Sequence, residues 1–385
     1  MTAGGGSGGH VTPVVAVISE LKNKQPEAEV RFWCDAKFAR QARTIMSHYD
    51  PNLPVDTILS GKLRRYHNMP VWRQMMHPLS IVWPNLRDMV FVVIGTIQSV
   101  IKLMLWRPDV IFTKGGFVCL PIGVAAKILN IPLVIHDSDA HPGLTNRILS
   151  KWANAIATGA PLKYYPYPRE ISQYVGIPIQ TNLKAPTDSE QQKLKQQLVG
   201  GANRPLIVIT GGGLGAKRLN DATAACLDRL RQSATIVLIS GVAQYEELRT
   251  KLGPDNETFQ LHDFIAQNMS QYLAAADIVV TRAGMTTILE LAALARPTIL
   301  VPNGYLTGGH QLKNAAVYAD ADAVEVLDEH QIDATPQVLG DAVEALLHDS
   351  ARRSHLAGQL HKFARPEAAS LVADTIIATA KPNHK

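Results

Sequence analysis

Cysteine is scarce in this sequence, and no single sign of charge dominates it. The three cysteines, Cys34, Cys119 and Cys226, lie far apart and outside any metal-ligand spacing. This pattern excludes a disulfide framework and favours a reducing compartment. The net charge of +5 is mildly basic, which suits an anionic substrate or membrane face and does not indicate nucleic acid as a partner.

Long apolar runs are missing as well. The start of the chain is rich in glycine and holds no apolar segment, so we expect no secretory signal. The longest apolar stretch, VFVVIGTIQSVIKLMLW at residues 90–106, contains Gln98 and Lys102. It is shorter than the roughly 20 residues that cross a bilayer. We therefore predict a helix buried on one face at this position.

The composition is that of a globular protein. Hydrophobic residues make up 46% of the 385 residues and charged residues 18%, and two domains is the usual number for this length. Short apolar runs alternate with longer amphipathic segments, which predicts an α/β fold with parallel sheets. In the first half we predict helices over 120–130 and 144–155 and strands over 30–35, 109–116, 132–139 and 155–160.

The pattern restarts after a polar junction at 176–204, within which a helix is predicted over 188–199. A strand, a glycine turn and the start of a helix follow at 205–220. Later helices are predicted over 286–295 and 310–320, and later strands over 235–241, 277–284, 297–304 and 323–327.

The two halves predict two Rossmann-like domains, 1–178 and 179–385, that face each other across a cleft. Ligands of such sheets bind at the carboxyl ends of the strands. Whether a C-terminal helix packs back on the first domain is left open.

The first glycine loop lies in TAGGGSGGHVTP, where Gly4, Gly6 and Gly9 fit the phosphate-binding spacing G-x-G-x-x-G. His10 stands where the following helix begins, so it is a candidate general base; a surface or capping histidine is the alternative. Only Met1–Ala3 precede this loop. We therefore expect the first strand to be missing or to begin upstream of Met1.

Two further loops follow predicted strands of the first half, TKGGF at 113–117 and HDSDAHPGLTN at 136–146. Asp137, Asp139, His141 and Asn146 offer donors and acceptors for sugar hydroxyls, and Asp137 is the second candidate base. The alternative is that some of them cap the next helix.

The second half offers a glycine loop, GGGLGAKR, and the segment RAGMTTILE. Gly284 ends a strand, so the helix after it directs free N–H groups, with Thr286 and Thr287, toward an anion such as a diphosphate. Glu290 lies further along this helix and could hold a ribose diol. A solvent-facing helix position explains Glu290 equally well.

Together these segments resemble one family in order and spacing: GGGSGGHVTP, KGGFVCLP, HDSDAHPGLTN, VGIPIQ, GGGLGAKRLN, RAGMTTILELAALARPTILVP and HQLKNA. The family is glycosyltransferase family 28, and the resemblance covers nearly the whole chain. It implies the GT-B fold, with a domain that binds the acceptor and the membrane first and a domain that binds the UDP-sugar second.

The resemblance also implies a reaction. N-acetylglucosamine passes with inversion from UDP-N-acetylglucosamine to the C4 hydroxyl of the muramyl sugar of lipid I, which forms lipid II for peptidoglycan. No metal or other cofactor is expected. The implied location is peripheral, on the cytoplasmic face of the plasma membrane.

Residue roles follow position by position from the same resemblance. Ser7, Gly8 and Gly9 match the loop that contacts the donor, and His10 matches the base. Asp139 stands where the family has an asparagine on the donor sugar, and Ile265 matches a uracil contact. The family's segment that binds the diphosphate and the ribose matches Met285, Thr286, Thr287, Ile288, Leu289 and Glu290. Within it, Glu290 matches the residue that holds the ribose hydroxyls.

Three positions depart from the family pattern. Gln180 replaces an arginine near the donor, and Gly213 replaces a serine in the second glycine loop. His310 replaces the first of two paired glutamines, while Gln311 remains. The lost arginine bears on the diphosphate contact, for which the nearby cations are Lys217, Arg218 and Arg282.

A membrane contact is predicted in residues 59–83, where basic and large apolar side chains alternate without transmembrane length. The alternative is that the apolar members pack beneath the first domain. The residues that we expect at the membrane are Leu63, Arg64, Arg65, Trp72, Met75 and Met76.

The sequence leaves other functions open. Asp35, at the end of a predicted strand, would suit the ribose of a nicotinamide cofactor in an oxidoreductase. A related glycolipid synthase and a non-catalytic subunit that binds nucleotide sugars are the other two alternatives.

Overall fold

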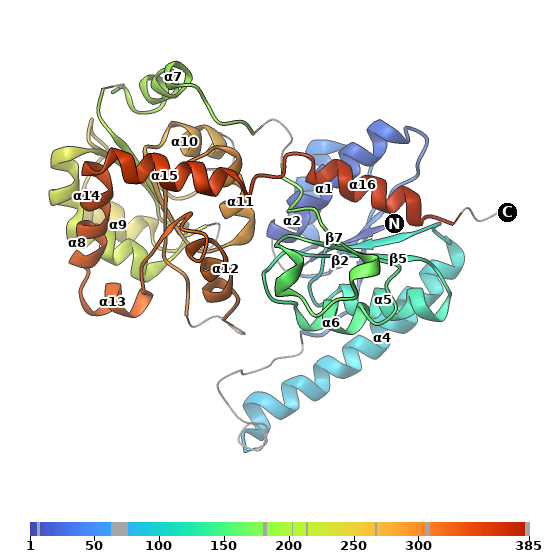
Figure 1. The fold of residues 1–385 in the computed structure, drawn as a ribbon. Coiled ribbons are helices and arrows are strands. Elements are labelled where there is room, and N and C mark those ends of the chain that lie inside the picture. Colours follow the sequence, from blue (N-terminus) through green and yellow to red (C-terminus); the bar gives the residue numbers. More distant parts are fainter. Residues whose placement is uncertain are drawn as a thin grey trace. The chain divides into compact units, whose positions relative to one another are not determined.

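The computed structural model describes residues 1–5, 8–62, 76–179, 183–201, 203–212, 215–265, 268–304 and 309–381. The chain divides into two compact units (Figure 1). The first is Met1–Thr181 together with Arg365–Lys385, and the second is Asn182–Ala364.

The first unit is built on a seven-stranded sheet in the order β3-β2-β1-β4-β5-β6-β7. Every neighbouring pair of these strands is parallel. The strands are β1 (Thr2–Ala3), β2 (Phe32–Asp35), β3 (Val55–Ile58), β4 (Ile111–Thr113), β5 (Leu133–Asp137), β6 (Ala155–Thr158) and β7 (Ser172–Tyr174). The four strands predicted in this half are confirmed, each shorter than predicted.

The expectation that the first strand is missing is wrong. The two residues of β1 occupy the central position, with Thr2 opposite both Phe32 and Phe112. Backbone bonds extend the pairing beyond them, since Met1 O accepts from Phe112 N at 2.9 Å and Gly4 N donates to Trp33 O at 3.2 Å. A short strand suffices here because it has a partner on both sides.

Helices cover both faces of this sheet: α1 (Gly8–Lys24), α2 (Ala39–Tyr49), α5 (Cys119–Ile128), α6 (Leu144–Leu149) and α16 (Ala368–Thr379). Ile18 of α1 and Val372 of α16 share one buried core, so the end of the chain belongs to the first unit (Figure 1). Helix α6 is shorter than the predicted 144–155, because the chain turns after Leu149 to begin β6.

Helix α4 (Trp83–Leu105) differs from the others in its exposure. One face, with Asp88, Gly95, Ser99 and Leu103, is buried as predicted. The rest is apolar and exposed, for example Val93 at 54% and Ile97 at 56%.

This helix is longer than the apolar stretch at residues 90–106, so the prediction that it is too short to cross a bilayer is wrong. The apolar helix covers Ser80–Leu105, 26 residues, with a mean hydropathy of 1.8 over a window of which only 22% is buried. By length and composition it could cross a membrane. The length of this helix was not evident from the sequence, because the polar side chains Asn85, Arg87 and Asp88 interrupt the apolar pattern in its first turns.

The second unit has a six-stranded parallel sheet in the order β10-β9-β8-β11-β12-β13. Its strands are β8 (Leu206–Thr210), β9 (Thr235–Ile239), β10 (Phe259–His262), β11 (Ile278–Thr281), β12 (Thr298–Leu300) and β13 (Glu325–Val326). The sequence missed β10, which has only four residues. Helix α7 (Asp188–Val199) covers the predicted range, and Thr187 and Glu190 form a capping box at its start.

The remaining helices of this unit are α8 (Lys217–Ser233), α9 (Tyr245–Leu252), α10 (Met269–Ala275), α11 (Met285–Ala293), α12 (His310–Ala319), α13 (Glu329–Ala334), α14 (Gln337–His348) and α15 (Ser350–His361). The sheet's side chains, such as Ile207 and Val280, pack with those of α8 and α14 into one core.

Bare backbone lets two loops of the first unit meet at the carboxyl edge of its sheet. Gly116 has φ +89°, and a Cβ there would lie 2.7 Å from the carbonyl oxygen of Gly5. The glycine-rich loop after β1 and the loop after β4 can therefore touch only because both are glycine at this point.

We expect Gly116→Ala to destabilise the first unit by about 1–3 kcal/mol, because alanine would be strained at this φ and would also clash. Urea denaturation followed by circular dichroism measures this. Gly358→Ala is the control: Gly358 lies inside α15 with open space around it, so alanine there should stabilise by roughly 0.5–1 kcal/mol. Equal effects of the two variants would contradict this account of the loop contact.

Candidate active site

In the first unit, the loops after β1, β4 and β5 come together at the carboxyl edge of the sheet. Gly8 and Gly9 are the first residues of α1, and His10 lies in its first turn. Ser7 lies outside the described residues. The glycine loop thus leads directly into a helix N-terminus, as the phosphate-binding spacing predicts.

Asp137, the second candidate base, ends β5 and is buried. Its Oδ2 accepts a hydrogen bond of 2.7 Å from the hydroxyl of Tyr167. Burial raises the pKa of Asp137 to about 7, an effect that the Tyr167 hydrogen bond opposes and the nearby Asp139 increases. A carboxyl group with a pKa near neutrality can exchange a proton at physiological pH.

Lys114 is a charged residue of this edge that the sequence did not single out. It follows β4, is only 1% exposed, and its Nζ donates to Ser138 Oγ. Burial lowers the pKa of Lys114 to about 8, although Asp139 and Asp137 act in the opposite direction. Its place in TKGGF, directly after a buried strand, was the available signal.

The remaining predicted residues of this edge hold the loop after β5. Asn146, buried in α6, donates to the carbonyl oxygen of His136 at 3.1 Å. Asp139 is half-buried, and its carbonyl oxygen accepts from the hydroxyl of Tyr165 at 2.7 Å. The structure thus brings Asp137, Asp139 and Asn146 together.

In the second unit, the N-terminus of α11 is open. Gly284 is its N-cap, no side chain caps it, and nothing lies within 4 Å of a Cβ built on Gly284. Ile288 N donates to Gly284 O, which leaves the N–H groups of Met285, Thr286 and Thr287 ahead of the helical ladder. This geometry suits an anion.

The predicted segment from Met285 to Glu290 has two faces. Met285, Ile288 and Leu289 are at most 3% exposed and belong to the core, so their side chains do not face a ligand. Thr286, Thr287 and Glu290 are half-exposed. Residues three and four apart share a helix face, which places these three together.

The side-chain carboxylate of Glu290 has no hydrogen-bond partner among the described residues. Burial alone raises the pKa of its carboxyl group to about 7. A carboxylate that is withdrawn from water and left without a donor is costly, unless a ligand supplies one.

Other predicted residues of the second unit lie in loops at the same edge. Ile265 follows β10 and is half-buried. His310 and Gln311 begin α12, and Gln311 Oε1 accepts from Asn303 N at 2.8 Å. Gln180 and Gly213 lie outside the described residues.

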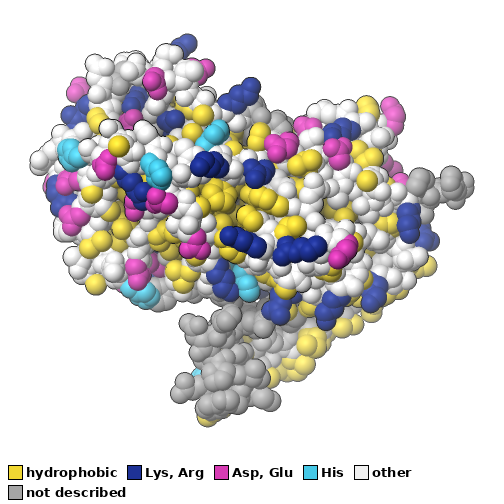
Figure 2. All heavy atoms as spheres, viewed as in Figure 1, with side chains coloured by type: hydrophobic (Ala, Val, Ile, Leu, Met, Phe, Trp, Pro, Cys, Tyr) yellow, Lys and Arg dark blue, Asp and Glu magenta, His cyan; other side chains and the backbone are white. Residues whose placement is uncertain are grey.

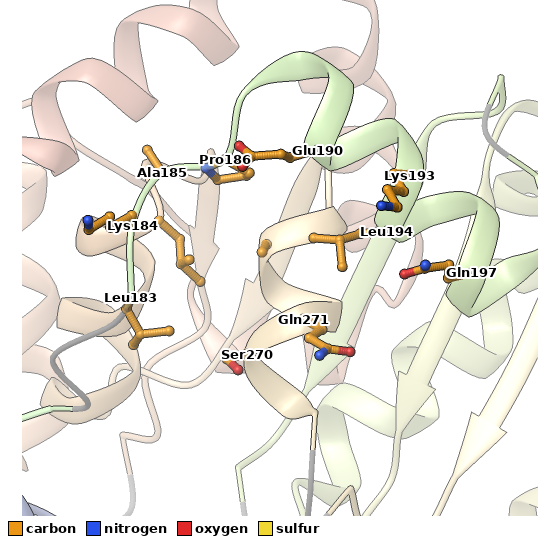
Figure 3. Close-up of a pocket in the computed structure, with 12 residues that line it drawn as sticks. Leu183, Lys184, Ala185, Pro186, Glu190, Lys193, Leu194, Gln197, Ser270 and Gln271 are labelled. Atoms are coloured by element: carbon orange, nitrogen blue, oxygen red, sulfur yellow. The ribbon is translucent and has the colours of Figure 1, made fainter.

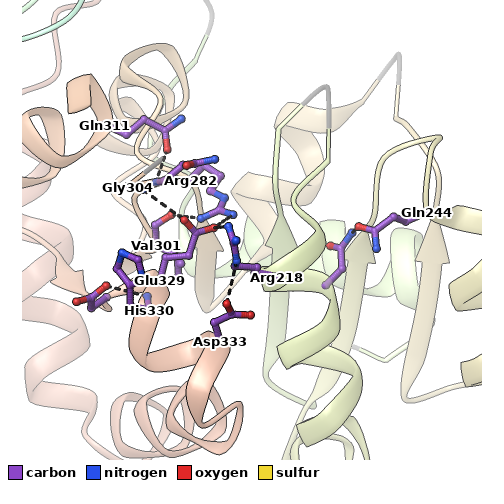
Figure 4. Close-up of polar contacts among 12 residues, drawn as sticks. Arg218, Gln244, Arg282, Val301, Gly304, Gln311, Glu329, His330 and Asp333 are labelled. Atoms are coloured by element: carbon purple, nitrogen blue, oxygen red, sulfur yellow. Dashed lines mark hydrogen bonds and ion pairs between the residues drawn. The ribbon is translucent and has the colours of Figure 1, made fainter. Parts of the chain in front are cut away.

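A cavity of about 490 Å³ adjoins the second glycine loop and the end of β11. Its charged lining is balanced, with three cations and three anions: Lys217, Arg218, Arg282, Asp221, Glu329 and Asp333. Arg282 Nη2 donates to Glu329 Oε1, and Arg218 Nε donates to Asp333 Oδ2 at 3.1 Å (Figure 4). Lys217 Nζ lies 3.0 Å from Asp221 Oδ2, so each of the three cations has an anionic partner.

Another cavity, of about 520 Å³, lies between residues 183–186 and the helices α7 and α10 (Figure 3). Leu183, Leu194 and Gln271 are among its lining residues. None of the predicted site residues lines this cavity.

Comparison with known proteins now decides the family. Residues 1–158 match the glycosyltransferase family 28 N-terminal domain, and residues 206–372 match the glycosyltransferase family 28 C-terminal domain. The chain belongs to glycosyltransferase family 28.

Relatives within family 28 align over most of the chain. A UDP-N-acetylglucosamine–N-acetylmuramyl-(pentapeptide) pyrophosphoryl-undecaprenol N-acetylglucosamine transferase of Shouchella clausii is 31% identical over 349 residues, 89% of each protein. The enzyme of the same name from Staphylococcus aureus is 32% identical over 338 residues, 87% of each. The crystal structure of Acinetobacter baumannii MurG has a TM-score of 0.73 at 26% identity and covers 98% of both chains.

These matches confirm the GT-B fold of two Rossmann-like domains and set aside the oxidoreductase alternative. Asp35, on which that alternative rested, caps a turn instead, since its Oδ1 accepts from Phe38 N at 3.1 Å.

The raised pKa of Glu290 predicts a pH-dependent effect on stability. The pKa of Glu290 is about 7 in the folded state, against an ordinary value of 4.5 for a glutamate. The carboxyl group therefore favours folding at low pH, and this contribution is lost as the pH rises from about 4.5 to 7. We expect Glu290→Gln to raise the melting temperature over that of the wild type more at pH 8 than at pH 5. Differential scanning calorimetry at both values checks this, and a pH-independent difference would contradict the raised pKa of this partly buried carboxyl group.

Proposed function

We propose that this family 28 enzyme transfers N-acetylglucosamine from UDP-N-acetylglucosamine to an N-acetylmuramyl-(pentapeptide) pyrophosphoryl-undecaprenol acceptor. The names of its relatives describe this reaction. The observation that carries it here is the open N-terminus of α11 with the unpartnered Glu290 on the same helix. The helix N-terminus suits a diphosphate, and the Glu290 carboxylate suits a diol.

In the proposed mechanism, the second unit holds the donor. The N–H groups at the start of α11 and the hydroxyls of Thr286 and Thr287 stabilise the diphosphate, and Glu290 accepts hydrogen bonds from the ribose hydroxyls. Ile265 contacts the uracil, and His310 and Gln311 lie on the sugar side. The charge that develops on departing UDP is then met by fixed dipoles.

The first unit holds the acceptor and the base. The muramyl C4 hydroxyl oxygen attacks the anomeric carbon of N-acetylglucosamine, and the bond from that carbon to the UDP oxygen breaks with inversion. The hydroxyl proton passes to His10 at the start of α1, with Asp137 as the second candidate. Asp139 and the N–H groups at Gly8 and Gly9 contact the sugar and diphosphate groups that enter this edge.

The donor assignment predicts selective binding. UDP-N-acetylglucosamine should bind and NADH should not, as measured by isothermal titration calorimetry. Glu290→Ala should weaken UDP binding by roughly 1.5–3 kcal/mol, the range for a hydrogen bond to a charged group. Unchanged UDP affinity would return Glu290 to an ordinary helix position, and NADH binding without UDP binding would overturn the transferase assignment.

The base assignment predicts a kinetic effect. His10→Ala should lower turnover by roughly 10²–10⁴-fold, the usual contribution of a general base, while UDP affinity changes little. Steady-state kinetics with a soluble acceptor analogue measures this. If turnover stays near normal, His10 is not the base and Asp137→Asn becomes the variant to test.

We further propose that α4 rests on an anionic membrane, because the acceptor is lipid-linked. Its exposed apolar side chains recur every three or four residues, as in Leu86, Val90, Val93, Ile97 and Ile101. Its opposite face packs on α5 and on the end of β3, where Gly95 lies against Leu59 O. A helix held along one face in this way lies in the plane of the membrane surface.

Charge supports this orientation. Figure 2 shows lysine and arginine side chains along the edge of the first unit next to the apolar face of α4. Exposed basic residues of the neighbouring α5 and of the α6 region are Lys127, Arg147 and Lys151. Met76, predicted at the membrane, is 68% exposed just ahead of α4, while Leu63, Arg64, Arg65, Trp72 and Met75 lie outside the described residues.

Membrane binding is testable with vesicles rich in anionic phospholipid. Val93→Glu with Ile97→Glu should reduce co-sedimentation at least tenfold, since each exposed side chain loses roughly 1.5–3 kcal/mol of burial in the lipid. UDP binding should persist. Val242→Glu, at a side chain 69% exposed in the second unit, is the control. Equal sedimentation of the double variant and wild type would remove α4 from the membrane contact.

A further inference from the structure

Glu329 is a buried carboxylate that no sequence motif marks. It is the first residue of α13, follows the last strand of the second sheet, and is only 2% exposed. Its position at the carboxyl edge puts it beside the cavity that adjoins the second glycine loop.

The contacts of Glu329 join three separate loops (Figure 4). Oε1 accepts from Arg282 Nη2 and lies 3.7 Å from Arg218 Nη1. Oε2 accepts from Gly304 N at 3.3 Å. Arg282 in turn donates to Val301 O at 3.0 Å. One carboxylate therefore links the loop after β11, the loop after β12 and the start of α8.

Each linked loop leads to a part of the donor site. Arg282 precedes Gly284, the N-cap of α11, by two residues, and Gly284 N donates to Arg282 O at 2.9 Å. Gly304 lies in the loop that leads to Gln311 at the start of α12. Arg218 follows the second glycine loop.

We propose that Glu329 is a positioning residue for donor binding, which through Arg282, Gly304 and Arg218 sets the relative placement of the N-termini of α11, α12 and α8. This inference rests on the proposed donor site. In this arrangement Arg218 and Arg282 do not replace the family's lost arginine. Their charges are paired with those of Glu329 and Asp333.

The ion pair also offers a way to separate positioning from stability. Replacing a buried ion pair by apolar residues of similar size is often neutral for folding. The double variant Arg282→Met with Glu329→Met should therefore melt close to the wild type. It should nevertheless bind UDP at least tenfold more weakly in calorimetry, because thioethers do not fix Gly304 or the turn before Gly284.

A conservative series gives a second reading if the double variant does not fold. Glu329→Gln keeps the shape and removes the charge, and should raise the KM for UDP-N-acetylglucosamine at least fivefold while kcat changes less than twofold. Glu329→Asp, which keeps the charge, should recover part of this loss. Asp341→Asn is the matched control: its partner Arg229 also joins α8 to the region after α13, but through an exposed ion pair near the other end of α8.

The outcomes separate the two levels of the proposal. If the wild type binds UDP-N-acetylglucosamine and the folded double variant or the Glu329→Gln variant binds it with equal affinity, the positioning role alone is overturned. Wild type without affinity for the nucleotide sugar overturns the donor site and the positioning role together.

Discussion

Both halves of this protein depend on the parallel pairing of their strands. In a parallel sheet every strand ends at the same edge, so each following loop is delivered to one side of the sheet. The loops after β1, β4 and β5 in the first unit and those after β8, β11, β12 and β13 in the second meet for this reason. Two-residue β1 shows how strong the constraint is, because a central place with two neighbours keeps even so short a strand in register.

Crowding of loops at one edge buries charge there. Lys114, Asp137 and the pair Arg282–Glu329 follow strands or begin a helix at a carboxyl edge, and Glu290 lies one turn further along α11. Burial shifts the pKa of Lys114, Asp137 and Glu290 toward neutrality, each by raising the cost of the charged form. Arg282 and Glu329 pair with each other, whereas the Glu290 carboxylate has no hydrogen-bond partner among the described residues.

The exposed apolar face of α4 has a different physical cause. Its buried face is narrow and contains small or polar residues such as Gly95 and Ser99, which allow close contact with the sheet. Large apolar side chains are therefore left on the outside, where water would be unfavourable and lipid would not. This exposed apolar face is the basis of the proposed membrane contact of α4.

The sequence by itself determined the architecture and the family. Apolar runs with glycine turns identified most strands, and motifs with chemical meaning, such as RAGMTTILE, marked the N-terminus of α11, because periodicity and turn chemistry are local properties. It also placed Asp137 and Asp139 at the end of β5 or just beyond it, and Glu290 in the helix after β11. Only the tertiary structure decided which of their neighbours they meet: Tyr167 with Asp137, Lys114 with Ser138, and Glu329 with Arg282, 47 residues apart. It also decided that α4 exposes its apolar face. Burial and pairing arise from contacts between segments distant in sequence, which no local pattern records.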